Sequence, residues 1–343
     1  MLTLLYRCGV ALRNSAYDIG LFRTHRILVP VVSVGNIAVG GTGKTPLAVE
    51  IASRFLARGI RTAYITRGYG RSTRGTVIVS DGSGNTLTAR EGGDEPVLAA
   101  GRLSSLVVIA DEMRVRGCRI AVERFQAKLL VLDDAFQHRA CARDADIVAV
   151  DAERDPFRDR LFPAGRLREP VASLRRADAV VLTKCRDMDT AHSLAERLSF
   201  FAGIPVFCSR FEPEDIRLLR SSHALPVSDL EERRLFSFCG IASPAAFLRT
   251  LADMGVHVVA HREFPDHYPY TARDVTALLS SVRTAGAEGF ITTEKDAVRL
   301  DPLASRFESF PVYYPRMTVR FEGDAGAFYR FLDERFAMRW EGR

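Results

Sequence analysis

The chain has 343 residues and very little lysine. Lysine occurs only at positions 44, 128, 184 and 295, and the other 44 of the 48 basic residues are arginine. Such a bias is typical of a GC-rich genome, so a single arginine is weak evidence for function, whereas each lysine is worth inspecting. The net charge of +6 favours an anionic partner such as phosphate, nucleic acid or an acidic membrane, without choosing among them.

Other absences exclude whole classes of protein. The six cysteines form no C-x-x-C pair, which argues against a disulfide framework or a zinc site and favours a reducing compartment. No run of 18 apolar residues occurs, so no membrane span is expected, and the N-terminus lacks the cleavage site of a signal peptide. The hydrophobic content of 47% and charged content of 26% are ordinary for a globular protein and exclude a disordered chain.

Apolar runs typical of strands alternate with helical patterns along the chain. The first series of predicted strands covers 29–34, 61–66, 105–109, 128–132, 146–150, 178–182 and 204–208. After a charged stretch with Pro and Ser (211–233), a second series follows, with strands 234–239, 256–260, 289–293 and 311–314 and helices 244–254, 271–284 and 325–336. We predict an α/β fold with a mostly parallel sheet flanked by helices. The predicted parts are an N-terminal helix (1–27), a larger domain (28–225) and a smaller α/β domain (226–343).

The N-terminal segment has the pattern of an amphipathic helix. Apolar residues recur at helical spacing from Leu5 to Ile19, and a basic cluster follows at residues 23–26. The helix could pack against the core, or it could lie on an anionic membrane with its arginines at the headgroups. On the pattern alone we favour the core-packed helix.

The strongest motif lies between the strand 29–34 and a helix that begins near residue 45. It reads Ala38, Val39, Gly40, Gly41, Thr42, Gly43, Lys44, Thr45, and it matches the P-loop pattern except that Ala38 replaces the first glycine. In such a loop, backbone N–H groups and the helix N-terminus hold phosphate oxygens. Lys44 would reach the β- and γ-phosphates of ATP, and Thr45 would offer its hydroxyl to Mg²⁺. The alternative, an ordinary glycine turn, does not explain the lysine and the threonine, so we predict a P-loop NTPase-like domain.

Acidic residues follow two later elements. Asp133 and Asp134 end the apolar strand 128–132, where a P-loop protein holds its magnesium ion, although carboxylates there could also cap the next turn. His138 could face the phosphates or be structural. Asp94, within Gly92-Gly-Asp-Glu-Pro96, could cap a helix or could be the base that accepts a proton from a substrate hydroxyl. Spacing leaves these alternatives open.

The remaining motifs are weaker. Arg67 and Arg71 flank an exposed glycine turn, and Arg168 could neutralise charge in a phosphoryl-transfer transition state, but all three could be surface arginines. The pair Thr183-Lys184 at a strand end could border the nucleotide base. His267, in Phe264-Pro-Asp-His-Tyr268, could be an acid/base partner or a loop residue, and Thr293 has the pattern of a helix cap.

Taken in order, these motifs resemble the tetraacyldisaccharide 4′-kinase (lipid A 4′-kinase) family over most of the chain. The matching residues are 34–36, 40–46, 67–70, 93–96, 133–138, 167–169, 264–267 and 293–296. The resemblance implies ATP-dependent phosphorylation of the 4′-hydroxyl of tetraacyldisaccharide 1-phosphate, which gives lipid IVA in the lipid A synthesis of Gram-negative bacteria. It further implies a membrane-associated enzyme at the cytoplasmic face of the inner membrane, with no nucleic acid and no obligatory protein partner. It therefore reverses our interpretation of residues 1–27, which we now expect to lie on the membrane.

The resemblance also implies roles for single residues. Asp94 matches the base of the family, His267 its partner (with His261 as the alternative), and Asp133 and Asp134 the carboxylates beside magnesium. Lys44 and Arg168 are expected to act on the transferred phosphoryl group. Residues expected to contact the substrate or to support the site are Arg67, Tyr69, Glu95, His138 and Glu169. One departure is Ala135 in place of the usual glycine, and because alanine tolerates positive φ poorly, a slightly different turn is expected there.

Two other functions stay open. A P-loop NTPase switch or metallochaperone would hydrolyse nucleotide in response to a protein partner, but Val39 stands where many dimeric members of those classes carry an additional lysine. A non-enzymatic nucleotide-binding module on membranes or nucleic acid is supported by the positive charge alone, since aromatic and basic residues are not interleaved as in nucleic-acid modules.

Overall fold

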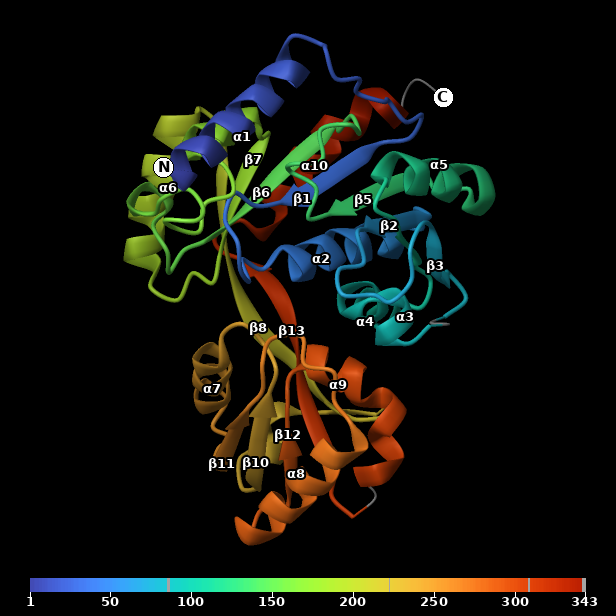
Figure 1. Ribbon diagram of the computed structural model, residues 1–343, viewed down its shortest axis with the longest axis vertical. Helices are drawn as coiled ribbons and strands as arrows, with labels where there is room; N and C mark the ends of the chain where they lie inside the picture. The colour runs from blue at the N-terminus through green and yellow to red at the C-terminus, as the bar shows by residue number, and fades with distance from the viewer. Residues whose placement is uncertain (85–86, 222, 308, 341–343) are drawn as a thin grey trace.

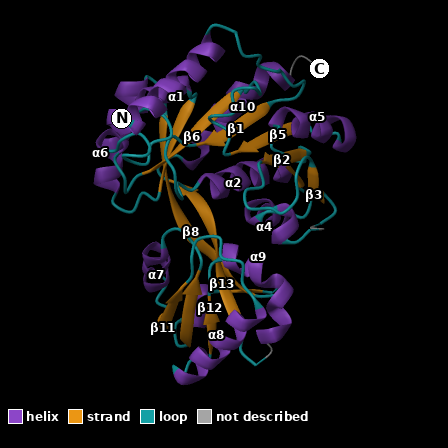
Figure 2. Ribbon diagram, in the orientation of Figure 1, coloured by secondary structure: helices purple, strands orange, loops and turns teal. Residues whose placement is uncertain are grey.

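The computed structural model describes residues 1–84, 87–221, 223–307 and 309–340. Its strands form one sheet in the order β11-β10-β12-β13-β8-β7-β6-β1-β5-β2-β4-β3, with β9 paired to β8. Neighbours are parallel except at β8–β13, β3–β4 and β8–β9. Helices lie on both faces of the strands (Figures 1 and 2). The predicted mostly parallel α/β fold is therefore confirmed.

The strands follow the apolar runs of the sequence. Their bounds are β1 (Val31–Gly35), β2 (Thr62–Thr66), β3 (Val77–Asp81), β4 (Val107–Ala110), β5 (Leu129–Asp133), β6 (Ala145–Asp151), β7 (Ala179–Thr183), β8 (Val206–Leu218), β9 (Ala224–Leu225), β10 (Arg234–Cys239), β11 (His257–Glu263), β12 (Gly289–Ile291) and β13 (Val312–Phe321). The α-helices are α1 (Leu2–Asp18), α2 (Lys44–Ala57), α3 (Ala89–Gly92), α4 (Asp94–Arg102), α5 (Arg114–Phe125), α6 (Met188–Ala202), α7 (Pro244–Asp253), α8 (Ala272–Thr284), α9 (Glu294–Leu300) and α10 (Ala325–Trp340).

The molecule has two lobes joined by the long strands β8 and β13 (Figure 1). The first lobe, which we call the P-loop lobe, has hydrophobic clusters on both faces of β1–β7, and the second lobe has its own clusters around β10 and β12. The first residues of β8 pair with β7, and its residues from Ser209 onward pair antiparallel with β13. This two-stranded ribbon is what connects the sheets of the two lobes.

The end of β8 and the lobe to which α10 belongs differ from the prediction. It ended a strand at residue 208 and began the boundary stretch at 211, whereas β8 continues to Leu218. The charged residues that suggested a linker lie on this ribbon, and most residues of β8 are only partly buried, so the pattern of the strand is not apolar. Helix α10 was assigned to the smaller domain (226–343), but Phe328, Leu332 and Phe336 are buried in the core of the P-loop lobe beside α2.

Helix α1 lies on the surface of the P-loop lobe (Figure 1). Within this helix, all of which the structure describes, Ala16 is the one buried residue, and Leu12 is 72% exposed. The core-packed interpretation of this helix is therefore wrong, and its leucines face outward. In the described part of the chain, no helix combines the length and hydropathy needed to cross a bilayer.

Candidate active site

The P-loop connects β1 to the first turn of α2, as the motif predicts. Asn36 donates a hydrogen bond from its side-chain amide to the Thr42 hydroxyl (3.0 Å), which fixes the loop on its strand. Gly43 lies immediately before α2 with φ +78°, and a Cβ there would be 2.4 Å from the ring of Phe211. Both the backbone conformation and the close approach of Phe211 therefore require glycine at this position.

Thr183 and Lys184 support the P-loop from the end of β7. The Thr183 hydroxyl donates to the Thr42 carbonyl (2.9 Å), and Lys184 donates to the Gly41 carbonyl and to Asp151, both at 2.7 Å. A cavity of about 860 Å³ begins beside Thr45 and Lys184 and extends between the lobes. The two residues thus hold loop backbone, and the expectation that they border the nucleotide base stays a prediction.

Asp133 lies at the end of β5 below the P-loop. The Thr45 hydroxyl donates to its Oδ2 at 3.0 Å, and the Tyr64 hydroxyl donates to the same oxygen. Burial and the nearby carboxylate of Glu95 raise the pKa of Asp133 to about 6. Two residues predicted to bind magnesium are therefore in direct contact, at a place where further positive charge would be favourable.

Asp134 is the meeting point of two cationic side chains. Its carboxylate lies 3.6 Å from Lys44 Nζ and accepts hydrogen bonds from Arg168 at 2.9 and 3.1 Å. Burial acts in the opposite direction, but Lys44 and Arg168 lower the pKa of Asp134. The left-handed residue of this turn is Asp134 (φ +48°) and not Ala135, so alanine in place of the usual glycine causes no strain.

Asp94 joins the two lobes. It is the first residue of α4, and Gly93 occupies the N-cap position, so the helix-cap interpretation of Asp94 is wrong. His267 of the second lobe contacts Asp94 Oδ2 through Nδ1 at 2.9 Å. Burial opposes the effect, but the bond with His267 and the charge of Arg299 lower the pKa of Asp94, and the same bond raises the pKa of His267. His261 instead pairs with Ser237 (3.0 Å), so it is not the histidine at Asp94.

Two more ion pairs connect α4 to α9 beside Asp94. Glu95 pairs with Lys295 at 2.7 Å, and Arg102 pairs with Glu294. Thr293 caps α9 by accepting the N–H of Asp296 (3.1 Å), as predicted. The sequence analysis did not assign Lys295 to the site, although its being one of only four lysines could have drawn attention to it.

The glycine turn after β2 lies next to the pair of Asp94 and His267. The Tyr69 ring is 5.3 Å from the ring of His267, and Tyr69 is 66% exposed. Arg67 is also exposed. Arg71 instead holds the local backbone, because it donates to the carbonyls of Ala110 and Gly75 and pairs with Glu112. Arg71 is therefore structural, whereas Tyr69 and Arg67 are exposed and their contact with substrate stays a prediction.

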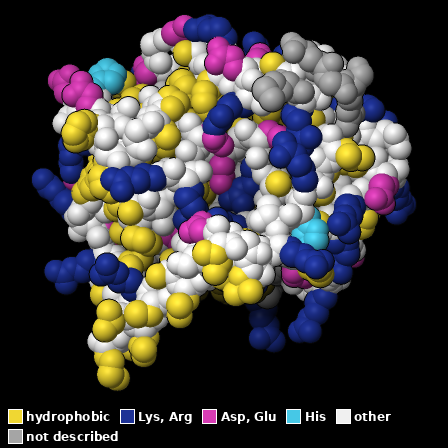
Figure 3. Space-filling view, turned by 90° about the horizontal axis from the view of Figure 1, so that it is seen from above, with side chains coloured by type: hydrophobic (Ala, Val, Ile, Leu, Met, Phe, Trp, Pro, Cys, Tyr) yellow, Lys and Arg dark blue, Asp and Glu magenta, His cyan; other side chains and the backbone are white. Residues whose placement is uncertain are grey.

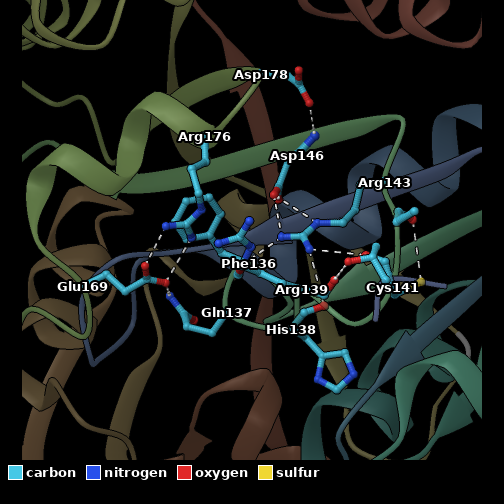
Figure 4. Close-up of polar contacts among 12 residues, drawn as sticks. Phe136, Gln137, His138, Arg139, Cys141, Arg143, Asp146, Glu169, Arg176 and Asp178 are labelled. Atoms are coloured by element: carbon cyan, nitrogen blue, oxygen red, sulfur yellow. Dashed lines mark hydrogen bonds and ion pairs between the residues drawn. The ribbon is translucent and has the colours of Figure 1, made fainter. Parts of the chain in front are cut away.

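His138 follows the turn at Asp134. Burial, together with the charges of Arg114, Arg143 and Arg13, lowers its pKa to about 4, so it is neutral at physiological pH. Figure 4 shows its ring turned away from the Arg143–Asp146 pair, whose arginine donates to the His138 carbonyl. A neutral imidazole at this place can accept or donate a hydrogen bond but cannot neutralise phosphate charge.

Glu169 was predicted to contact substrate or to support the site, and the structure shows a supporting role. Its buried carboxylate accepts hydrogen bonds from Arg176 and Gln137 at 2.8–3.3 Å (Figure 4). It also accepts one from Asn14 of α1 at 2.8 Å. Burial opposes them, but these bonds lower the pKa of Glu169. Glu169 therefore ties α1 to the loop that carries Arg168.

We expect Glu169→Ala to lower the free energy of unfolding by about 2–4 kcal/mol, because it leaves the partly buried Arg176 without its partner. Urea unfolding followed by circular dichroism measures this change. Glu196→Ala, an exposed residue of α6, is the matched control and should change the stability by less than about 0.5 kcal/mol. Equal effects of the two variants would contradict the supporting role.

Sequence reasoning missed three buried residues of the site. Arg114 lies near Asp133 and Asp134, Tyr64 bonds Asp133, and Arg299 bonds Asp94. None had a signal of its own: an arginine is unremarkable in this chain, and Tyr64 reads as one more residue of an apolar strand.

Comparison with known proteins agrees with this geometry. The sequence profile of the family described as tetraacyldisaccharide-1-P 4′-kinase matches residues 1–337. A tetraacyldisaccharide 4′-kinase of Anaeromyxobacter sp. (strain Fw109-5) is 44% identical over 301 residues, which cover 87% of this chain and 81% of that protein. One of Chlorobium limicola is 40% identical over 327 residues, which cover 93% and 92%.

A solved structure is similar as well. It is described as the "apo" form of LpxK from Aquifex aeolicus in complex with ATP, and it is 32% identical with a TM-score of 0.79. The match covers 98% of this chain and 97% of that chain. These matches do not favour the NTPase switch or metallochaperone. The chain belongs to the tetraacyldisaccharide-1-P 4′-kinase family.

Proposed function

We propose that this enzyme transfers the γ-phosphoryl group of ATP to the 4′-hydroxyl of tetraacyldisaccharide 1-phosphate, with Asp94 as the base. The observation that carries the proposal is the pair of Asp94 and His267 beside a P-loop. The neighbouring Glu95 is close enough to Lys44 and Asp134 for their charges to act on its pKa, which supports a position of the pair beside the phosphates. A residue that accepts the hydroxyl proton is what transfer to an alcohol requires.

The phosphates would lie on residues 38–45, with Lys44 and Arg168 on the γ-phosphoryl group. The acceptor oxygen attacks phosphorus in line, a new O–P bond forms, and the bond from phosphorus to the β-phosphate oxygen breaks to release ADP. The hydroxyl proton passes to Asp94. The contacts of Asp94 with His267 and Arg299 both end on Oδ2, so Oδ1 is the oxygen that we assign to the proton.

The residues around Asp133 fit magnesium. Mg²⁺ prefers oxygen ligands, and the Thr45 hydroxyl, Asp133 and Asp134 supply them at one place. Burial and, to a smaller extent, the charges of Glu95 and Asp134 raise the pKa of Asp133, and a divalent cation would stabilise its ionised form. When bound, the ion would neutralise charge on the β- and γ-phosphates.

The glycolipid substrate would be reached at the membrane surface. Helix α1 exposes leucines along its length, and Arg23 and Arg26 follow it. Seen from above, hydrophobic side chains gather along one edge of this face with arginines among them (Figure 3). Such a surface suits an anionic bilayer, with apolar groups below the headgroups and arginines among them. We place the enzyme at the cytoplasmic face of the inner membrane, without nucleic acid or an obligatory protein partner.

The test is a transfer assay with γ-labelled ATP, Mg²⁺ and detergent-dispersed tetraacyldisaccharide 1-phosphate. We expect label in the lipid with the wild type and a loss of about 10²-fold or more with Lys44→Ala, because a cation on the transferred group is removed. Lys128→Ala is the matched control, since Lys128 is exposed, and it should keep full activity. ATP hydrolysis without labelled lipid, from a folded preparation, would contradict the proposal and favour the switch.

A further inference from the structure

Arg299 is a buried cation in contact with Asp94. Its side chain is only 6% exposed. Nε donates to Asp94 Oδ2 at 2.7 Å, and Nη1 donates at 2.9 Å to both the Gly240 carbonyl and Asp296. Asp94 belongs to the P-loop lobe and the other contacts to the second lobe, so Arg299 reaches across the boundary to the base.

The backbone of Gly240 holds both Arg299 and His267 in place. The Gly240 carbonyl accepts from Arg299 and from the backbone N–H of His267 (3.2 Å). Asp296 in turn accepts the Gly240 N–H (3.1 Å) and the Tyr270 hydroxyl (2.8 Å). His267 has φ +57°, a conformation that a histidine keeps only where its surroundings fix it. The two groups that meet on Asp94 Oδ2 are therefore set by the same buried contacts.

We infer that Arg299 is a positioning residue for phosphoryl transfer: it and His267 hold Asp94 by Oδ2, so that Oδ1 is presented to the acceptor hydroxyl. This inference rests on the proposed role of Asp94 as the base. Arg299 touches neither substrate in this scheme, and its effect is exerted through the orientation and charge of Asp94 and His267.

The charges around the pair give the inference a pH signature. Asp94 faces Arg299, His267 and Lys295, whereas His267 faces Asp94, Asp266, Arg299 and the ring of Tyr69. The bond to Asp94 raises the pKa of His267 from its ordinary value of 6.5, and the charge of Arg299 lowers it. Arg299 therefore keeps His267 neutral to a lower pH than Asp94 and Asp266 alone would allow.

Protonation of His267 should slow the reaction. A full positive charge on Nδ1–H stabilises the ionised form of Asp94 and weakens its ability to accept a proton. The rate should therefore fall as the pH drops through the pKa of His267, while Asp94, whose pKa is lowered, stays ionised. Without Arg299 the pKa of His267 rises, so this acidic fall should move to higher pH.

The experiment compares Arg299→Met and Arg299→Lys with the wild type in the lipid transfer assay from pH 5.5 to 9. We expect Arg299→Met to lower kcat by about 10–100-fold with little change in the KM for ATP. The midpoint of the acidic fall should move upward by about 0.5–1 unit. Arg299→Lys keeps the positive charge but cannot bond Asp94 and Gly240 through two separate nitrogens. It should therefore restore the midpoint of the acidic fall, while kcat stays below that of the wild type.

Arg102→Met is the matched control. It breaks the neighbouring ion pair between α4 and α9 without touching Asp94, so it loosens the same boundary. It should leave the midpoint unchanged. An unshifted midpoint in Arg299→Met, or the same shift in Arg102→Met, would overturn the inference and leave Arg299 as a purely structural contact.

The Asp94→Asn background separates this inference from the proposed function. If Arg299 acts through Asp94, adding Arg299→Met to Asp94→Asn should lower the residual activity less than twofold. A full additional loss would overturn the inference alone. Full activity of Asp94→Asn itself would instead contradict the proposed base.

Discussion

Asp94→Asn is expected to lower kcat for lipid phosphorylation by about 10²–10⁴-fold, the usual range for removing a general base. The amide keeps the size of the side chain but cannot accept the proton of the 4′-hydroxyl. ATP binding should persist, because in the proposed mechanism the phosphates would lie on residues 38–45 and not on α4. The measurement is kcat in the labelled-lipid assay, together with the Kd for ATP.

Asp189→Asn is the matched control for this variant. Asp189 is exposed in the first turn of α6, and its substitution should keep kcat within about twofold of the wild type. The measured Kd for ATP shows whether Asp94→Asn is folded, since the pairs to His267 and Arg299 are lost. Turnover at the wild-type level in a variant that binds ATP would exclude Asp94 as the base.

Arg168→Met should lower kcat by about 10³-fold, as removal of a cation from the transition state of phosphoryl transfer does. Its backbone N–H donates to the Ile37 carbonyl (2.7 Å), and its carbonyl accepts from Tyr6 of α1 (2.9 Å). The guanidinium is thereby held on Asp134, the carboxylate that also lies near Lys44. In the proposed mechanism, negative charge that develops on the γ-phosphoryl group would therefore be stabilised by a donor that is already held in place. Single-turnover kinetics measure the chemical step directly.

Arg168→Lys should recover part of the loss, because it keeps the charge without the two-pronged geometry of arginine. Arg160→Met, at an exposed residue of the same loop, is the matched control and should have little effect. If Arg168→Met raised only the KM for the lipid and left kcat unchanged, Arg168 would be a substrate-binding residue and not a transition-state donor.

Local motifs predicted the phosphate site best. The P-loop lies within eight consecutive residues, and its chemistry depends on their spacing, so the sequence contains nearly all of it. Asp94 and His267 are 173 residues apart, and the sequence could pair them only through resemblance to a family. Their contact depends on how α4 and the loop after β11 pack across the two lobes, which no local pattern specifies.

Buried charges explain the remaining errors. Glu169 was expected to contact the substrate or to support the site, and the sequence could not choose between these roles, because its partners come from α1, from the turn after β5 and from residue 176. Arg299 and Arg114 are hidden among 44 arginines for the same reason. The amphipathic pattern of α1 could not choose between a core and a membrane, because either environment takes the same apolar face.

The P-loop lobe is built from two separate stretches of the chain, which affects the order in which the protein forms during synthesis. Its core around Leu47 and Phe55 needs Phe328, Leu332 and Phe336 of α10, whereas the clusters of the second lobe come from residues between 216 and 313. At a translation rate of about 5–20 residues per second, the first stretch waits on the order of ten seconds for α10. The residues of the second-lobe clusters are therefore synthesised before those of α10, and until α10 is made the apolar side chains around Leu47 and Phe55 lack part of their cover.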